Sequence, residues 1–374
     1  MLKDLSKKMV FITGPRQVGK TYLAKQIMGK FQNPQYLNFD NFTDRNIINE
    51  MSWVQNSDIL IFDEIHKMKN WKNYLKGVYD SKKSGQAILI TGSARLDTFR
   101  QSGDSLAGRY FHHRLNPFSV KELASKITAY EAVDKLNNFG GFPEPILQSL
   151  NLPAEDAVIE AERWKNQYYT DLIREDILEF SRINEINTMK TLVEVLRLKV
   201  GSPLSINSIA EDLQASPNTI KKYINILESL YVIFLVRPLH KNIARSILKE
   251  PKIYFYNTSY IKGDAGIKLE NTTAVCLLKH VQYLYDAKGA NYSLNYLRTK
   301  DGKEIDFVVA KDDKPLQFLE VKLSSKQLSA PLLYFSARYP EVESVQLVYN
   351  LHQEEEKRNI KLLKLSDWLA ELAA

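Results

Sequence analysis

The sequence predicts an α/β protein that opens with a parallel β-sheet and continues into helical and mixed segments. Three short apolar runs carry the first part of this prediction, at residues 9–13, 59–62 and 87–91. Continuous apolar runs of this length are typical of parallel strands that are covered on both faces. Each run leads into glycine or acidic residues, so groups that can bind or react stand where the predicted strands end.

The first run enters a glycine-rich turn, and residues 22–28 then show helical spacing. A turn of this kind between a strand and a helix is the context of a phosphate-binding loop. Gly14 and Gly19 let backbone N–H groups point at phosphates, and the helix N-terminus near Lys20 adds positive charge. We expect ATP to bind here, with Lys20 at its terminal phosphates and Thr21 as a ligand of Mg²⁺. The full loop reads Gly14, Pro15, Arg16, Gln17, Val18, Gly19, Lys20, Thr21.

Acidic and hydroxyl groups follow the other two runs. Asp63 is expected to hold Mg²⁺, directly or through water, and Glu64 to orient or deprotonate the attacking water. The third run ends in Gly92-Ser93, which is expected to place the Ser93 hydroxyl near the γ-phosphate. The alternative is an α/β domain whose strands end in acidic residues by chance. The order of loop, acid pair and hydroxyl favours the nucleotide site.

These motifs resemble those of prokaryotic AAA+ ATPases, and most closely a group with a C-terminal domain of unknown function. The resemblance implies a P-loop ATPase core over residues 1–125, then a helical lid and connecting helices over residues 126–200. It continues beyond the phosphate loop through Ile61-Phe62-Asp63-Glu64-Ile65, Leu89-Ile90-Thr91-Gly92-Ser93-Ala94, Ser105-Leu106-Ala107-Gly108-Arg109-Tyr110, Leu115-Asn116-Pro117-Phe118-Ser119 and Gly140-Gly141-Phe142-Pro143-Glu144.

Within this resemblance Ser93 takes a sensor role, and Arg109 is a candidate for the arginine that a neighbouring subunit supplies to the transferring phosphoryl group. That role implies a homo-oligomer. The alternative is an Arg109 that fixes a helix end or forms a surface salt bridge. Arg16 is a further candidate for contact with phosphate or with a neighbouring subunit. In the lid, the stripe that includes Trp164, Tyr168 and Tyr169 is expected to pack in the core.

Residues 201–250 have the layout of a winged helix-turn-helix. Residues 205–213 predict one short helix, residues 215–217 a turn, residues from 218 onward a second helix, and residues 232–236 a wing strand. In a DNA-binding protein the start of the second helix enters the major groove. The alternative is a fold that only mediates protein contacts. The residues expected at the recognition surface are Asn218, Thr219, Lys221, Lys222 and Tyr223.

The distribution of charge favours DNA as a partner. The chain carries a net charge of +7, with a pI of about 9.0. Between Lys199 and Lys249, seven basic residues stand against three acidic ones, a net charge of +4. More than half of the excess therefore lies in the segment with the helix-turn-helix pattern.

Residues 251–374 predict a C-terminal module with the element order α-β-β-β-α-β, which resembles the restriction-endonuclease-like PD-(D/E)xK superfamily. The resemblance implies that Asp306 and Glu320 bind Mg²⁺, that Glu270 adds a ligand or holds a metal-bound water, and that Lys322 stabilises the developing anion or positions the nucleophile. Relatives usually carry Asp-x-Gly where this chain has Asn257-Thr258-Ser259. The alternative is a retained fold that binds nucleic acid or a protein without cutting.

The remaining composition favours a cytoplasmic protein without a membrane segment. Cys276 is the one cysteine, which excludes an intrachain disulfide, and no apolar run approaches the ~20 residues of a membrane span. The sequence therefore predicts an ATP-hydrolysing, DNA-directed protein with a nuclease-like C-terminal module. The rival hypothesis is an ATP-driven switch that recognises a protein partner and has no nuclease activity.

Overall fold

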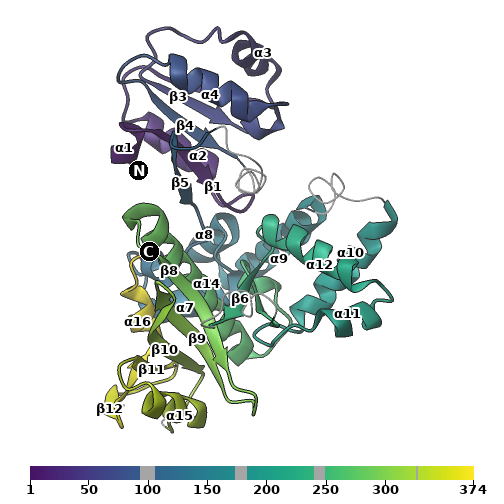
Figure 1. Cartoon of the computed structure of the whole chain (residues 1–374), viewed down its shortest axis with the longest axis vertical. Helices are drawn as coiled ribbons and strands as arrows, with labels where there is room; N and C mark the ends of the chain where they lie inside the picture. The colour runs from purple at the N-terminus through teal and green to yellow at the C-terminus, as the bar shows by residue number, and fades with distance from the viewer. Residues whose placement is uncertain (93–105, 173–182, 240–248, 326) are drawn as a thin grey trace. The chain divides into compact units, whose positions relative to one another are not determined.

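The computed structural model describes residues 1–92, 106–172, 183–239, 249–325 and 327–374. The chain divides into two compact units, which are coloured along the sequence in Figure 1. The first unit consists of Met1–Asn116 together with Ser229–Tyr231. The second consists of Pro117–Glu228 together with Val232–Ala374.

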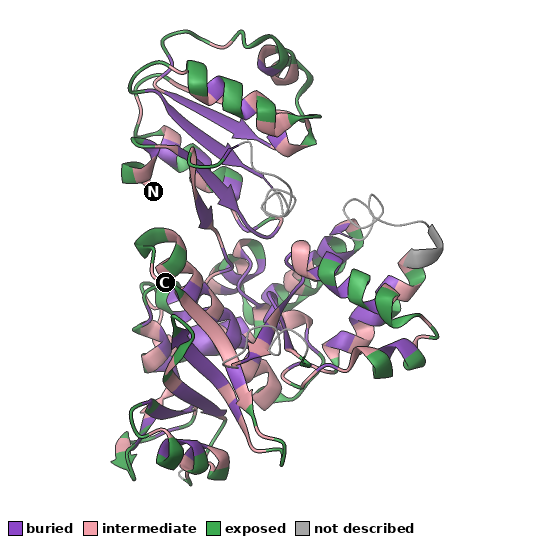
Figure 2. Cartoon of the chain, in the orientation of Figure 1, coloured by how far each residue is buried: buried purple, intermediate pink, exposed green. Residues whose placement is uncertain are grey.

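The first unit contains a five-stranded sheet in which all strands are parallel, in the order β2-β3-β4-β1-β5. The three predicted strands are confirmed as β1 (Met9–Thr13), β3 (Ile59–Asp63) and β4 (Ala87–Thr91), and each is buried over its whole length (Figure 2). The edge strands β2 (Pro34–Asn38) and β5 (Tyr110–Arg114) contain polar residues, so no apolar run marked them in the sequence.

Helices cover both faces of this sheet. On one face, Ala24 and Ile27 of α2 (Lys20–Met28) share a core cluster with alternate residues of β1 and β3. On the other face, α3 (Phe42–Glu50) and α4 (Trp71–Ser81) pack against the intervening residues of the same strands. Successive strand side chains point to opposite faces, so the unit has three layers. The short α1 (Leu2–Leu5) and η1 (Ile65–Lys67) complete it.

The second unit begins with a helical region. Its described helices are α6 (Val120–Leu123), α7 (Ala129–Phe139), α8 (Pro143–Asn151), α9 (Ala154–Asp171), α10 (Ile183–Arg197), α11 (Ile206–Asp212) and α12 (Pro217–Ser229). The aromatic stripe of α9 is buried as predicted, because Trp164, Tyr168 and Tyr169 are each less than a tenth exposed. The helices expected over residues 205–213 and from residue 218 onward are also present.

An eight-stranded sheet forms the rest of this unit, in the order β12-β13-β11-β10-β9-β8-β6-β7. The predicted α-β-β-β-α-β order is confirmed by α14 (Ala265–Lys288), β8 (Tyr292–Arg298), β9 (Glu304–Lys311), β10 (Lys314–Lys322), α15 (Ala330–Arg338) and β11 (Glu343–Val348). The elements that follow are β12 (Glu355–Lys357), β13 (Ile360–Lys364) and α16 (Leu365–Ala370).

The expected separation near residue 250 is not a break between compact units. The predicted wing strand belongs to β6 (Ile233–Pro238), which pairs antiparallel with β7 (Lys252–Phe255) and parallel with β8. One sheet therefore runs across residue 250. Backbone pairing between strands from distant parts of the chain leaves little trace in the residues themselves, which is why the sequence pattern suggested a boundary there.

Cys276 lies buried in α14, as expected for a small apolar side chain, and burial raises the pKa of its thiol to about 11. Among the described residues, no helix combines the length and the apolar composition needed to cross a membrane.

Candidate functional site

The glycine-rich turn joins the end of β1 to the start of α2, as predicted. Gly14 has φ 145°, and a Cβ atom placed there would lie 2.1 Å from the carbonyl oxygen of Leu115. Gly19 has φ 99° at the N-cap of α2. Both positions need glycine, because a side chain would strain the backbone and at Gly14 would also collide with it. The turn can therefore curl tightly in front of the helix N-terminus, which is the arrangement that receives phosphate groups.

The Lys20 ammonium lies across the turn. Lys20 is 8% exposed, and its Nζ donates hydrogen bonds to the carbonyl oxygens of Pro15 at 2.6 Å and Gly14 at 3.0 Å. Arg16, in the same turn, is half-buried. The chain thus holds a cation directly against the backbone that would surround the phosphates.

The two predicted Mg²⁺ ligands are in direct contact. Thr21 Oγ1 donates to Asp63 Oδ2 at 2.8 Å. Two residues that the sequence analysis missed bind the same carboxylate: Tyr36 donates to Oδ2 at 2.6 Å, and Thr91 to Oδ1 at 2.7 Å. The backbone N–H of Glu64 donates to Oδ1 at 3.1 Å. Thr91 ends a predicted strand and could have been noticed, whereas Tyr36 lies on an edge strand without an apolar signal.

Glu64 has a different environment from its neighbour. It stands at φ 55° just after β3, and its carboxylate lies 3.5 Å from both His66 Nε2 and Lys67 Nζ. Burial raises the pKa of Glu64, and the charge of Asp63 adds to the rise, while Lys67 and Lys20 oppose it. A carboxylate with a raised pKa is a stronger base toward water.

The residue before the turn is also anchored. Thr13 Oγ1 lies 2.7 Å from His112 Nε2 and 3.2 Å from the hydroxyl of Tyr231. Tyr231 has φ 57° and follows α12 in the chain by two residues. Nothing in the sequence pattern linked residue 231 to the phosphate loop.

Arg109 lies at the other edge of the sheet. It directly precedes β5, whose first residue pairs with Met9 at the start of β1, whereas the phosphate loop follows the end of β1. A five-residue strand spans roughly 15 Å. The Arg109 guanidinium donates to Asp80 Oδ1 at 2.9 Å and Oδ2 at 3.3 Å, in a partly exposed ion pair at the end of α4. Ser93, the residue expected in the sensor role, lies outside the described residues.

On α12 the expected recognition residues have unequal exposure. Asn218, Lys221 and Lys222 are exposed and Thr219 is half-buried, but Tyr223 is 1% exposed. The expectation that Tyr223 faces a ligand was therefore wrong. It lies on the face of α12 that packs into the core, together with Ile220, Ile224 and Leu227.

The four candidates of the C-terminal module come together in one cluster. Asp306 of β9 accepts a hydrogen bond from the backbone N–H of Val321 on the neighbouring β10. On β10 itself, Lys322 Nζ lies 2.8 Å from Glu320 Oε1. Ser329 also donates to Glu320, at 3.0 Å. Tyr254 donates to Glu270 Oε1 at 2.7 Å, which ties α14 to β7.

Lys252 of β7 is the member of this cluster that the sequence analysis missed. It is 1% exposed, and its Nζ lies 2.7 Å from Glu304, 3.5 Å from Glu270 and 3.7 Å from Asp306. Burial alone would lower the pKa of Lys252, but the three carboxylates raise it above its usual range. The available signal was a lysine at the start of an otherwise apolar strand.

Two carboxyl groups of the cluster hold their protons to an unusually high pH. Burial, and next the charge of Asp306, raise the pKa values of Glu270 and Glu320 to about 7. Glu320 Oε2 is buried and accepts no hydrogen bond from the described residues. Within the described part of the chain, no three Asp, Glu, His or Cys side chains are grouped as metal ligands would be. Lys252 and Lys322 are the lysines whose ammonium groups the structure places against these acids.

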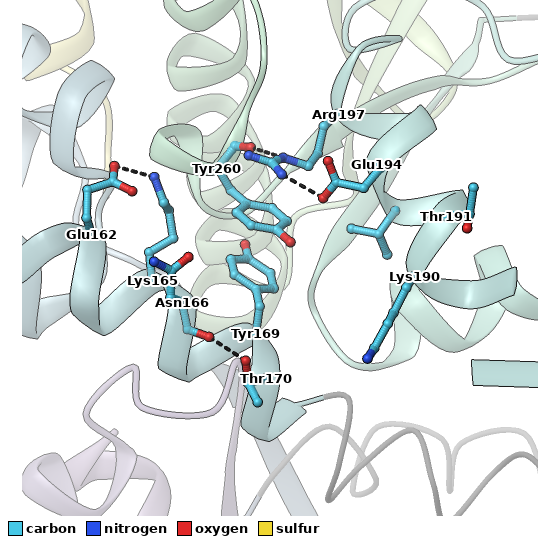
Figure 3. Close-up of a pocket in the computed structure, with 11 residues that line it drawn as sticks. Glu162, Lys165, Asn166, Tyr169, Thr170, Lys190, Thr191, Glu194, Arg197 and Tyr260 are labelled. Atoms are coloured by element: carbon cyan, nitrogen blue, oxygen red, sulfur yellow. Dashed lines mark hydrogen bonds and ion pairs between the residues drawn. The ribbon is translucent and has the colours of Figure 1, made fainter. Parts of the chain in front are cut away.

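A cavity of about 550 Å³ lies between α9, α10 and the turn η4 (Thr258–Tyr260), as Figure 3 shows. The rings of Tyr169 and Tyr260 stack with their centres 3.4 Å apart, and the guanidinium of Arg197 lies 4.0 Å from the ring centre of Tyr260. Arg197 also pairs with Glu194 at 2.7 Å. The charged groups at this cavity are largely paired with one another, which leaves little net charge for a ligand.

Comparison with known proteins assigns the first unit to a class. Residues 6–124 match the family model of an AAA domain. Residues 130–268 and 265–368 match models of two domains of unknown function, DUF8612 and DUF4143.

Two curated relatives extend over most of the chain. An uncharacterized protein of Methanocaldococcus jannaschii is 27% identical, and the match covers 87% of this chain and 80% of that protein. An uncharacterized protein of Haemophilus influenzae is 23% identical, with 96% and 93% covered. A solved RuvB variant of Thermotoga maritima aligns at 17% identity over 61% of this chain and 81% of its own, with a TM-score of 0.27, too low to support a conclusion. By its loop, its parallel sheet and its family match, the first unit is an AAA-type P-loop domain.

Proposed function

We propose that this protein binds ATP together with Mg²⁺, hydrolyses it at the phosphate loop, and uses the cycle to act on DNA. The observation that carries the ATPase proposal is the 2.8 Å hydrogen bond between Thr21 and Asp63. It joins a hydroxyl and a carboxylate, two oxygen ligands suited to Mg²⁺, in front of the loop that holds Lys20.

Each residue has a distinct task in this proposal. The backbone N–H groups of the loop and Lys20 bind the phosphates and offset their charge. Thr21 and Asp63 would hold Mg²⁺, which would offset the negative charge of the phosphates. Glu64 positions the attacking water and accepts its proton, a role that its raised pKa favours.

Lys20→Ala and Glu64→Gln test the ATPase proposal. Lys20→Ala is expected to abolish ATP binding, because it removes the cation at the phosphates. Glu64→Gln is expected to bind ATP but to hydrolyse it at least ~100-fold more slowly, because it removes the base. Fluorescent-nucleotide binding and phosphate release measure the two steps, and Lys30→Ala, at an exposed position just after α2, is the matched control. Normal turnover in both variants would refute the assignment.

The proposal for DNA rests on the second unit. The helices α11 and α12 followed by the β6–β7 hairpin support a winged helix-turn-helix, and the net charge of +4 between residues 199 and 249 supports a polyanionic partner. The rival function is an ATP-driven switch that binds a protein. Affinities for duplex, branched and single-stranded DNA at several salt concentrations separate the two, because phosphate contacts weaken steeply with salt. Absence of salt-dependent binding to all three would favour the rival.

Metal-dependent cleavage by the C-terminal cluster is a second candidate activity. The buried, unpartnered Oε2 of Glu320 favours it, because a cation would satisfy this oxygen. Lys252 and Lys322 favour a cluster that is neutralised without metal. Calorimetric titration with Mn²⁺, without nucleotide, distinguishes these states. If the cluster cleaves with a metal ion, the wild type binds Mn²⁺ at a site that Asp306→Asn lacks. Equal heats of Mn²⁺ binding in the two proteins would indicate that the module binds its partner without cutting it.

A further inference from the structure

A second cavity, of about 370 Å³, lies within the second unit where three elements meet. One wall comes from residues 204–207 at the start of α11, and another from Lys221, Ile224 and Asn225 in the middle of α12. The third comes from Leu235 and Arg237 of β6 and from residues 249–251, which lead into β7. None of its lining residues belongs to the phosphate loop or to the carboxylate cluster.

Basic side chains dominate this cavity. Lys221, Arg237 and Lys249 line it, against one acidic residue, Glu250. None of these three basic side chains forms an ion pair or a side-chain hydrogen bond with another described residue. By contrast, Lys252 and Arg197 of the same unit are each paired with glutamate.

The carboxyl group of Glu228 interacts with one of these basic side chains, Arg237. Burial raises the pKa of Glu228 on α12, and Arg237 partly offsets the rise. Because burial disfavours the ionised form of Glu228, this carboxyl group offsets the charge of Arg237 less than an exposed carboxylate would. The cavity keeps its positive character.

Three like charges around one small cavity repel one another unless an anion lies between them. The neutral polar groups at the same place, Ser205, Asn207 and Asn225, can donate hydrogen bonds to the oxygens of such an anion. No aromatic residue is among the described residues of its lining, so it offers no surface on which a base could stack. The geometry suits a compact polyoxygen anion.

We propose that this cavity grips a phosphate group of a nucleic-acid backbone. The inference rests on the proposed action on DNA and names the part of the DNA that is held. Contacts to phosphate position a protein on the duplex without reading sequence. The cavity is thus a sequence-independent anchor, and the exposed residues at the start of α12 are left to contact bases.

The test uses the full chain and two duplexes of unrelated sequence, with affinity measured by fluorescence anisotropy over a range of salt concentrations. Three single variants remove one cavity charge each: Lys221→Gln, Arg237→Gln and Lys249→Gln. Each is expected to lower the affinity for both duplexes by the same factor and to reduce the slope of log affinity against log salt by about 0.9. Arg237→Lys, which keeps the charge, retains the slope. The control is Lys126→Gln, which removes an exposed charge elsewhere in the unit, and circular dichroism melts verify folding.

Lys222 provides the sharpest comparison, because it neighbours Lys221 on α12 but does not line the cavity. If Lys222→Gln reduces the slope as much as Lys221→Gln, the helix surface and not the cavity holds the phosphate. Losses that differ between the two duplexes would also overturn the anchor, because they indicate base reading. If folded wild-type protein binds neither duplex, the proposed action on DNA fails. Unchanged slopes in all three cavity variants, with normal wild-type binding, refute the cavity alone.

Discussion

Two adjacent carboxylates, Asp63 and Glu64, have opposite surroundings. Asp63 accepts hydrogen bonds from Thr21, Tyr36, Thr91 and a backbone N–H, so its orientation is fixed. The Glu64 carboxylate instead lies 3.5 Å from His66 Nε2 and Lys67 Nζ, and burial raises its pKa. The environment therefore separates a group suited to holding a cation from a group suited to accepting a proton.

Tyr36→Phe tests the positioning of Asp63. The change removes the 2.6 Å hydrogen bond to Oδ2 and leaves the bond from Thr21 in place. We expect the Mg²⁺ concentration for half-maximal ATPase activity to rise several-fold, because the carboxylate can then rotate. Tyr22→Phe, at an exposed position on α2, is the control. An unchanged Mg²⁺ requirement would reduce Tyr36 to a packing role.

The C-terminal carboxylates predict a pH dependence of stability. The pKa values of Glu270 and Glu320 are raised from 4.5 to about 7, so the folded state keeps protons that the unfolded state releases. Stability is expected to fall as pH rises from about 4.5 to about 7 and then to level off. The melting temperature measured by calorimetry should decrease by several degrees between these two pH values. Glu270→Gln should make this decrease smaller. If the melting temperature decreases as much in Glu270→Gln as in Glu341→Gln, the control at an exposed position, this explanation is wrong.

At the scale of elements, the parallel sheet separates two groups of functional candidates. The phosphate loop and Asp63 follow the ends of β1 and β3, whereas Arg109 precedes the start of β5. Parallel strands keep starts and ends at opposite edges, so Arg109 stands far from the loop of its own chain. A contact between Arg109 and ATP bound to the same chain is therefore disfavoured. Arg109 either forms only a surface ion pair or contacts ATP bound to a neighbouring subunit.

Comparing Arg109→Ala with Asp80→Asn decides between these roles. Both variants break the ion pair at the end of α4. If Arg109 serves a neighbour, Arg109→Ala lowers kcat by ~1000-fold or more, while Asp80→Asn stays near the wild-type value. Steady-state ATPase assays measure both variants. Equal and small losses would leave Arg109 as one half of a surface salt bridge.

For the whole molecule, a neighbour-supplied arginine makes ATP hydrolysis a property of an assembly. Turnover per subunit is then expected to rise with protein concentration. The proposed homo-oligomer is tested by the same measurement, accompanied by light scattering. A monomer with concentration-independent activity would exclude the assembly.

Mixing two inactive variants provides a direct test of this assembly. Arg109→Ala subunits keep Glu64, and Glu64→Gln subunits keep Arg109, so an interface between them contains one complete site. We expect the mixture to recover a measurable part of the wild-type rate, up to about a quarter if subunits exchange at random. No recovery, with exchange demonstrated by light scattering, would exclude an Arg109 that is supplied by a neighbouring subunit.

The sequence alone determined the phosphate loop, the acid pair and the strands that carry them. These features are local: glycine at positive φ, an apolar run and the residue that ends it lie next to one another in the chain. The element order of the C-terminal module could be predicted for the same reason, since periodicity and turn residues are also local.

Tertiary structure decided which distant groups share a site. Tyr36 meets Asp63 because β2 pairs with β3, and Lys252 enters the carboxylate cluster because β7 and β6 join the sheet that contains β9. Tyr231 reaches Thr13 across 218 residues of sequence. Such contacts depend on strand pairing and packing between segments far apart in the chain. A single sequence records each partner but not the pairing, because the free energy that selects it belongs to the folded molecule.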